Sequence, residues 1–247
     1  MTPDRIDHIV AAMARQVPDG AFVGVGLGTP SALVASVLAT RMRGGHVLAG
    51  GAFDVDPPVD RWFAGPDATI GSTSGYVSHF DSMEWAETQT MTLQFLRPAQ
   101  IDGSGNLNTS RLGPVSEPMR RFPGGLATGD VTQLLPRVVA YLVSHRLRNT
   151  PDKLPFLTGS GAASSAGGFA SHGVASLVTD LGVIEWHNGT AKLTQVHPWT
   201  SIGQVIESTG FRIETEDAGP SPAPSERELA MLAEIDPNRL RDRELAR

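Results

Sequence analysis

Residues 21–27 (AFVGVGL), followed by Gly28-Thr29-Pro30, decide the fold class. A short apolar run rich in valine is typical of a strand buried in a sheet. Glycine ends the run, and threonine followed by proline is the signal for an N-cap and a first helical residue. Apolar residues then recur at helical spacing, at Leu33, Val34, Val37 and Leu38. The stretch predicts strand, glycine turn and helix, the repeating unit of an α/β fold.

The same alternation continues on both sides of this unit. Thr2-Pro3 predicts the N-cap and start of a first amphipathic helix. His46–Ala49 predicts the next strand, and Gly50-Gly51 follows it where a βαβ unit places its functional loop. A further helix is expected around residues 80–87, with strands over residues 91–96 and 138–143. We therefore expect an open, mostly parallel sheet flanked by helices.

The C-terminal part predicts a β-hairpin and then a helical extension. Asn188-Gly189 lies between two strand-like runs and supplies the positive φ angles of a type I′ turn. Ser225 and Glu228 form a capping-box pattern, and Asp236-Pro237 restarts a final short helix. We expect one α/β domain over residues 1–219, with residues 220–247 packed on it as a helical extension.

Composition excludes several classes of protein. The chain has 247 residues, 40% of them hydrophobic, which suffices for one sizeable core. The net charge is −6 and the basic residues are interleaved with acids, so we expect no nucleic-acid partner. Cysteine is absent, which excludes disulfides and thiolate chemistry. No apolar run approaches the length of a membrane span or a signal-peptide core, so we expect a cytoplasmic protein with no membrane partner.

Three common kinds of site find little support. Gly24, Gly26 and Gly28 lie between a strand and a helix, but their spacing is not that of a dinucleotide-binding fingerprint. His79, Asp81 and Glu84 are the one histidine cluster on a single face, and solvated helix charges explain them better than a metal does. No serine lies in a nucleophile elbow.

Three segments at strand ends, two of them with paired glycines, remain as candidates. They are Gly50-Gly51, residues 97–100 (RPAQ) and residues 122–125 (FPGG). Such segments serve either as plain loops of an open sheet or as a cleft in which backbone N–H groups face an oxyanion. Composition alone leaves both interpretations open.

Motifs that resemble one known family occur in order along nearly the whole chain. None is specific alone, but the ordered series is a strong signal. They are residues 23–26 (VGVG) with Pro30, residues 99–102 (AQID) with Gly105, Asn106 and Asn108, residues 121–125 (RFPGG), residues 179–183 (TDLGV), His197-Pro198, residues 209–211 (TGF) and residues 235–237 (IDP). By this series the chain resembles the B (β) subunits of family I CoA-transferases, of the glutaconate CoA-transferase type.

The resemblance implies a partner and a substrate class. The partner would be an A (α) subunit of similar fold, in an α₂β₂ or αβ assembly. An acyl-CoA would bind at the subunit interface, so that coenzyme A enters as part of the substrate and no bound cofactor is implied.

One departure from the family concerns the nucleophile. In the transferases a glutamate follows the strand that resembles His46–Ala49, and its carboxylate carries CoA as a glutamyl thioester. Gly50 stands at that position here and offers no nucleophile. Asp54 and Asp56 follow nearby. A genuine CoA-transferase, in which Asp54 replaces the glutamate or the glutamate is supplied elsewhere, is therefore one alternative.

Two branches that lack the glutamate also resemble the chain. Residues 235–237 and 240–244 resemble a steroid ring-cleaving CoA hydrolase subunit, and residues 197–199 and 209–211 resemble a glutaconyl-CoA-type decarboxylase subunit. Both reactions break a C–C bond and leave an enolate, which needs oxyanion stabilisation more than a nucleophile. We therefore expect ring-opening hydrolysis or decarboxylation by an enzyme that is active only with its partner. A non-catalytic subunit that stabilises its partner is the third hypothesis.

The expected site residues follow from the resemblance. Those expected to shape the catalytic cleft are Gly50, Gly51, Gln100, Gly124 and Gly125, and those expected to bind substrate are Arg97, Asn106, Asn108, Gly26 and Gly28. No metal ligand is among them, and the general base is expected on the partner. Arg97-Pro98 stands where the family usually has two small residues. Its guanidinium either clamps a substrate carboxylate or pairs with an acid of the partner, and the two are weighed equally.

Overall fold

The computed structural model describes residues 4–26, 28–50, 54–62, 72–162 and 173–245. The chain forms two compact units. Unit 1 contains Met1–Phe95 and Pro222–Arg247, and unit 2 contains Leu96–Ser221. The sequence predicts a single domain over residues 1–219 and gives no sign of the boundary between the two units at residues 95 and 96. The C-terminal segment belongs to the same unit as the N-terminal helix, because both pack on one layer of helices.

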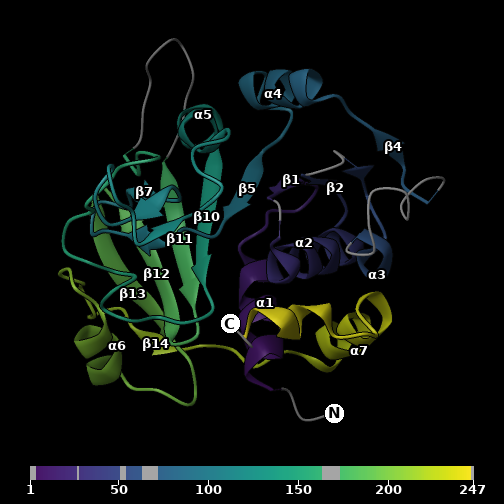
Figure 1. Ribbon diagram of the computed structural model, residues 1–247. Coiled ribbons are helices and arrows are strands. Elements are labelled where there is room, and N and C mark those ends of the chain that lie inside the picture. Colours follow the sequence, from purple (N-terminus) through teal and green to yellow (C-terminus); the bar gives the residue numbers. More distant parts are fainter. Residues whose placement is uncertain (1–3, 27, 51–53, 63–71, 163–172, 246–247) are drawn as a thin grey trace. The chain divides into compact units, whose positions relative to one another are not determined.

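Unit 1 is an α/β unit built on a five-strand arrangement (Figure 1). Its strands, in spatial order, are β5 (Leu93–Leu96), β1 (Phe22–Val25), β2 (His46–Ala49), β3 (Asp54–Val55) and β4 (Gly75–Tyr76). The first three are parallel neighbours, and β3 and β4 continue antiparallel. Its helices are α1 (Arg5–Arg15), α2 (Pro30–Arg43), α3 (Val59–Trp62), α4 (His79–Glu87), α7 (Glu226–Ile235) and the 3₁₀ helix η3 (Leu240–Glu244).

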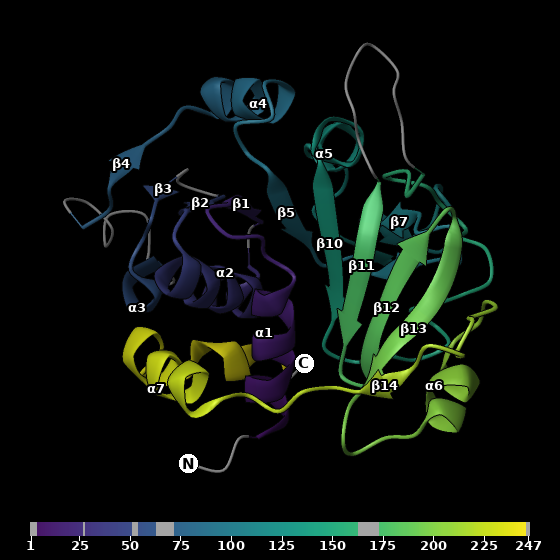
Figure 2. The same ribbon diagram turned by 180° about the vertical axis from the view of Figure 1, so that it is seen from behind.

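The helices α1, α2, α7 and η3 form one packed layer of unit 1. Figure 2 shows α7, drawn in yellow, beside α2 and α1, and α2 contacts α1, α7 and η3. Every residue of α2 from Pro30 to Ala39 is buried, because the sheet covers one side of this helix and other helices cover the rest. The C-terminal elements thus complete the core around α2.

Unit 2 contains the predicted hairpin and two small sheets. Its main strands, in spatial order, are β14 (Gly219–Pro220), β13 (Thr190–Val196), β12 (Gly182–His187), β11 (Val174–Thr179) and β10 (Arg137–Leu142). The small sheets pair β6 (Gln100–Ile101) with β7 (Leu107–Asn108), and β8 (Arg111–Leu112) with β9 (Arg120–Arg121). The helices are α5 (Thr128–Leu134) and α6 (Ile202–Ser208).

The predicted fold class is confirmed, with antiparallel strands added to the parallel ones. The hairpin β12–β13 turns at Asn188 and Gly189, whose φ angles of 52° and 79° are those of a type I′ turn. The capping box of Ser225 and Glu228 begins α7 as expected. None of the helices within the described ranges has the length and apolar composition that a membrane span requires.

One predicted helix start is wrong and the other is confirmed. The N-cap of α1 is Asp4, not Thr2, because Asp4 and Asp7 form a reciprocal capping box. The helix α2 begins at Pro30 with Thr29 as its N-cap, as predicted, but the Thr29 hydroxyl donates to the carbonyl of Gly26 at 2.7 Å and makes no capping bond. Local sequence offers several cap residues, and backbone geometry selects among them.

Candidate functional site

The glycines of unit 1 lie at the carboxyl ends of two parallel strands. Gly26 follows β1 and Gly50 follows β2, in a register that pairs Val25 with Ala49. The Gly50 N–H donates to the Val25 carbonyl at 2.7 Å. A Cβ at position 50 would lie 2.9 Å from that carbonyl oxygen, so a side chain there requires a backbone shift. Gly51 lies outside the described residues.

The turn after β1 is open on the side where a Cβ would project. A Cβ at Gly26 or Gly28 would meet no heavy atom of a described residue within 4 Å, and Gly28 has a φ of +66°. The structure therefore places both predicted substrate-binding glycines at an edge of the sheet where a ligand can approach the backbone.

No glutamate precedes Glu84 in the chain, so neither β1 nor β2 can present one. Asp54 is fully buried within β3, where it pairs with Ala49 and Tyr76 in the strand register. Asp56 accepts the Val47 N–H at 2.8 Å and lies 2.8 Å from His46 Nδ1. Asp54 thus lies in β3 and Asp56 directly after it, and no residue of β2 itself carries a carboxylate.

Glu244 is a residue near this edge that the sequence analysis did not single out. Its buried carboxylate accepts the Ser31 N–H at 2.9 Å, in the first turn of α2. A carboxylate is favourable there because the helix dipole and the unpaired N–H groups attract negative charge. The N-terminus of α2 is therefore already occupied by the chain's own carboxylate, which argues further against a bound dinucleotide phosphate.

In unit 2, Gln100 and Asn108 form a buried amide pair across β6 and β7. Asn108 Nδ2 donates to Gln100 Oε1 at 2.9 Å, and Gln100 Nε2 donates to the Arg148 carbonyl at 2.9 Å. Asn108 Nδ2 also donates to the Arg111 carbonyl at 2.8 Å. The structure thus brings the two amides together, and their hydrogen bonds hold the framework of this segment.

Asn106 is engaged in a similar way. Its Nδ2 donates to Asp102 Oδ2 at 3.1 Å, and its Oδ1 accepts the Gly161 N–H at 3.1 Å. Asp102 Oδ1 also accepts the backbone N–H groups of Ser104 and Asn106. Asn106 therefore ties the turn between β6 and β7 to the segment around Gly161.

Gly124 and Gly125 form the turn between β9 and α5. Gly124 has a φ of +91° and is held by Thr109, whose carbonyl accepts its N–H at 3.1 Å and whose hydroxyl donates to its carbonyl at 2.9 Å. Gly125 is exposed, and its carbonyl accepts the Thr128 N–H. Its own N–H has no acceptor among the described residues. Gly125 therefore supplies a backbone N–H that no described residue engages.

Two of the three candidate segments lie at the carboxyl ends of strands of the main sheet, as expected. Gly50 follows β2, and Arg97 follows β5 with a half-buried side chain. Gly124-Gly125 follows only the two-residue strand β9 and leads through α5 to the start of β10. His79, Asp81 and Glu84 of α4 gain no support as a metal site. Among the described residues, no three histidine, aspartate or glutamate side chains lie close enough together to hold a metal ion.

The chain is similar to proteins that are named for three different reactions: CoA transfer, ring cleavage and decarboxylation. The family described as coenzyme A transferase matches residues 6–208. The B-type subunit of 3-oxoadipate CoA-transferase from Pseudomonas knackmussii is 29% identical over 244 residues, which cover 93% of this chain and 92% of that one. The cholesterol ring-cleaving hydrolase IpdB subunit of Rhodococcus jostii is 30% identical over 155 residues, 60% of each chain. The crystal structure of the decarboxylase AibA/AibB gives a TM-score of 0.84 at 25% identity, over 97% of this chain and 98% of that one.

Proposed function

The chain belongs to the coenzyme A transferase family as a B-type subunit, and on this premise we propose that it cleaves a C–C bond of an acyl-CoA together with an A-type partner. The reaction is ring-opening hydrolysis or decarboxylation, without a glutamyl-CoA intermediate. Coenzyme A takes part as a portion of the substrate. A heteromeric assembly is supported by relatives whose names include paired subunits, such as AibA/AibB.

One observation carries this proposal: neither β2 nor Gly50-Gly51, which follow it directly, contains a residue with a carboxylate. The transfer reaction needs a nucleophile that forms an acyl anhydride and then a thioester with the enzyme. Asp56 would first have to give up its bonds to Val47 and His46, and Asp54 is buried within a strand. C–C cleavage needs no such group on this chain, because the bonding electrons pass into an enolate oxygen that N–H donors stabilise.

The turn at Gly125 supports the same reaction. Its exposed N–H is oriented by a turn that Thr109 fixes on both sides of Gly124. A preorganised donor of this kind stabilises an oxyanion without having to reorganise during the reaction. Gly125 is the residue of this chain to which we assign that role.

A genuine CoA-transferase is the second candidate, since the transferase subunit from Pseudomonas knackmussii aligns over nearly the whole chain. Trapping separates the two candidates. The purified complex with its A-type partner is treated with borohydride in the presence and in the absence of acyl-CoA, and activity and intact mass are measured. We expect no acyl-CoA-dependent loss of activity and no mass change on this chain. Acyl-CoA-dependent inactivation with reduction of Asp54 or Asp56 would instead show a transferase.

A further inference from the structure

Two arginines lie directly opposite each other in the small sheet of β8 and β9. The antiparallel register pairs Arg111 with Arg121. Side chains in such a pair lie on the same face with Cβ atoms about 5 Å apart, and like charges in this arrangement repel each other. The hairpin therefore concentrates positive charge at some cost in stability.

The chain does not neutralise this charge within the part that the structure describes. Neither arginine forms an ion pair with a described residue, and Glu117, the acid in the loop between the two strands, is exposed and bonds to neither. Arg111 Nη1 donates only to the Gly113 carbonyl. Each guanidinium carries five N–H donors, so most of them remain available to an external acceptor.

Arg111 is also held in place before any ligand binds. Its guanidinium stacks on the ring of Phe156 at 4.4 Å from the ring centroid. Phe156 precedes Thr158, whose hydroxyl lies 2.8 Å from that of Ser110 and accepts the Thr109 N–H at 3.1 Å. A cation that is already ordered loses less conformational entropy on binding.

The arginine pair is continuous with the turn that carries the free backbone donor. The Phe122 N–H donates to the Ser110 carbonyl at 2.9 Å, and the Gly124 N–H donates to the Thr109 carbonyl at 3.1 Å. The pairing of the two strands thus runs on to Gly124, and Gly125 follows directly. An anion on the arginines would be held beside the turn to which we assign oxyanion stabilisation.

We propose that Arg111 and Arg121 form a binding site for an oxyanion group of the acyl-CoA substrate. This inference rests on the proposed function for the identity of the substrate. The oxyanion is either a phosphate of the coenzyme A portion or a carboxylate of the acyl chain, and both accept paired hydrogen bonds from guanidinium groups.

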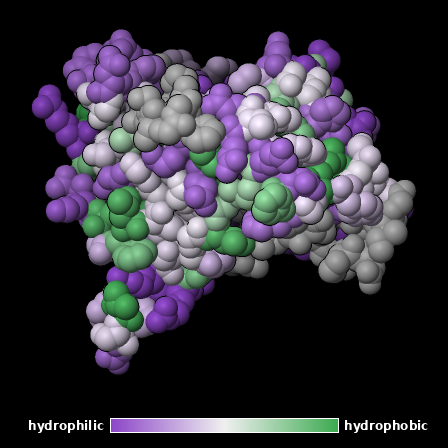
Figure 3. Space-filling view, turned by 90° about the horizontal axis from the view of Figure 1, so that it is seen from above, coloured by the Kyte–Doolittle hydropathy of each residue, from purple (hydrophilic) through white to green (hydrophobic). Residues whose placement is uncertain are grey.

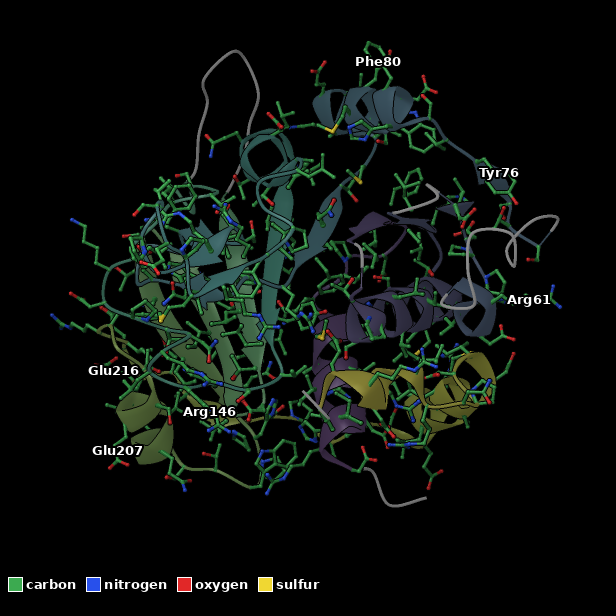
Figure 4. The ribbon with its side chains drawn as sticks, in the orientation of Figure 1. Arg61, Tyr76, Phe80, Arg146, Glu207 and Glu216 are labelled. Atoms are coloured by element: carbon green, nitrogen blue, oxygen red, sulfur yellow. The ribbon has the colours of Figure 1, made fainter. Side chains whose placement is uncertain are left out.

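Calorimetric binding to the complex with the A-type partner tests the site without requiring turnover. The probes are glutaryl-CoA, glutaryl-pantetheine, which lacks the phosphates, and valeryl-CoA, which lacks the carboxylate. The variants are Arg111→Ala and Arg121→Ala, with Arg146→Ala as the control. Arg146 is an exposed arginine that follows β10, at the opposite end of that strand from α5 (Figure 4).

We expect Arg111→Ala and Arg121→Ala each to weaken glutaryl-CoA binding about tenfold or more, and Arg146→Ala to leave it unchanged. A loss that persists with valeryl-CoA and disappears with glutaryl-pantetheine identifies a phosphate, and the reverse identifies the acyl carboxylate. The melting temperature of the Arg121→Ala complex is expected to stay constant or rise, because a repulsion is removed.

Two results would overturn the site: unchanged affinity for all three probes, or loss of the A-type partner from the variant complexes, which would assign the arginines to an acidic surface of that partner. The proposed reaction is tested independently of the proposed site. Arginine-dependent binding without C–C cleavage would keep the site and reject the reaction, whereas cleavage with unchanged binding would reject the site alone.

Discussion

His145 is a buried histidine whose protonation state is set by its neighbours in unit 2. Its Nε2 lies 2.9 Å from the Thr209 hydroxyl, and that hydroxyl donates to the Val205 carbonyl at 2.7 Å. Thr209 must therefore accept from Nε2–H, and the other ring nitrogen, Nδ1, lies 3.1 Å from the Thr179 hydroxyl. Burial lowers the pKa of His145 to about 4, so the ring is neutral at pH 7.

The lowered pKa of His145 predicts acid sensitivity. Between pH 6.5 and about 4 the unfolded chain binds a proton at this ring and the folded chain does not, so the free energy of unfolding falls as pH falls through this range. The full loss is about 3 kcal/mol. Denaturant unfolding of the wild type and of His145→Gln at several pH values checks this, and the variant should show the flatter profile. Burial also lowers the pKa of His8, but this histidine is present in both proteins and adds the same pH dependence to each. Equal slopes of the free energy of unfolding against pH would therefore contradict the prediction.

A buried ionic cluster holds the 3₁₀ helix η3 against the rest of unit 1. Arg241 contacts Asp7 of α1 at 2.8 Å and Asp236 at 2.7 Å, and all three side chains are at most 4% exposed. Glu244 of the same helix caps α2 through Ser31. The C-terminal element thus connects α1 to the end of α2 beside the Gly26 turn.

Replacement of Arg241 is expected to cost far more than replacement of its exposed neighbour. Arg241→Met leaves two buried carboxylates without their cation and should lower the free energy of unfolding by about 3–5 kcal/mol. Arg243→Ala, at an exposed position on the same helix, should change it by less than about 0.5 kcal/mol. Urea unfolding measures both. Similar small effects in the two variants would show that the cluster contributes little.

At the scale of the whole molecule, the face seen from above gives little indication of where a partner binds. Seen from above, the hydrophobic residues form separate patches bordered by hydrophilic ones among the coloured residues (Figure 3). Exposed apolar side chains occur in both units, with Phe80 in unit 1 and Met119 in unit 2 each 83% exposed. The partner is therefore inferred from the family. Arg111 and Arg121 of β8 and β9 offer a more specific binding site than these apolar side chains do.

The proposed function predicts a heteromer. Native mass spectrometry of this protein, purified from its own source, should detect an A-type chain in one-to-one ratio, as an α₂β₂ or αβ assembly. The purified partner alone should lack acyl-CoA cleavage. A partner that keeps full activity alone would instead support a stabilising role for this chain, and a protein that purifies alone would contradict the shared active site.

Local sequence was sufficient for several of the elements and for the family. The alternation of apolar runs with helical spacing predicted β1, α2 and β2, because burial on one side or both leaves a pattern within a few residues. Asn188-Gly189 predicted the hairpin, since only a few residue types adopt positive φ at low cost. The absence of a glutamate at the end of β2 is likewise visible in the sequence alone.

Tertiary structure decided which side chains meet. Ser31 and Glu244 are 213 positions apart, and neither residue carries a local signal of the contact. Gln100 and Asn108 were singled out as site residues, but only the pairing of β6 with β7 shows that their amides satisfy each other. Arg111 and Arg121 are ordinary surface arginines in the sequence, and the register of β8 and β9 makes them a pair. Strand register and helix packing depend on the whole chain, whereas periodicity and turn chemistry depend on neighbouring residues.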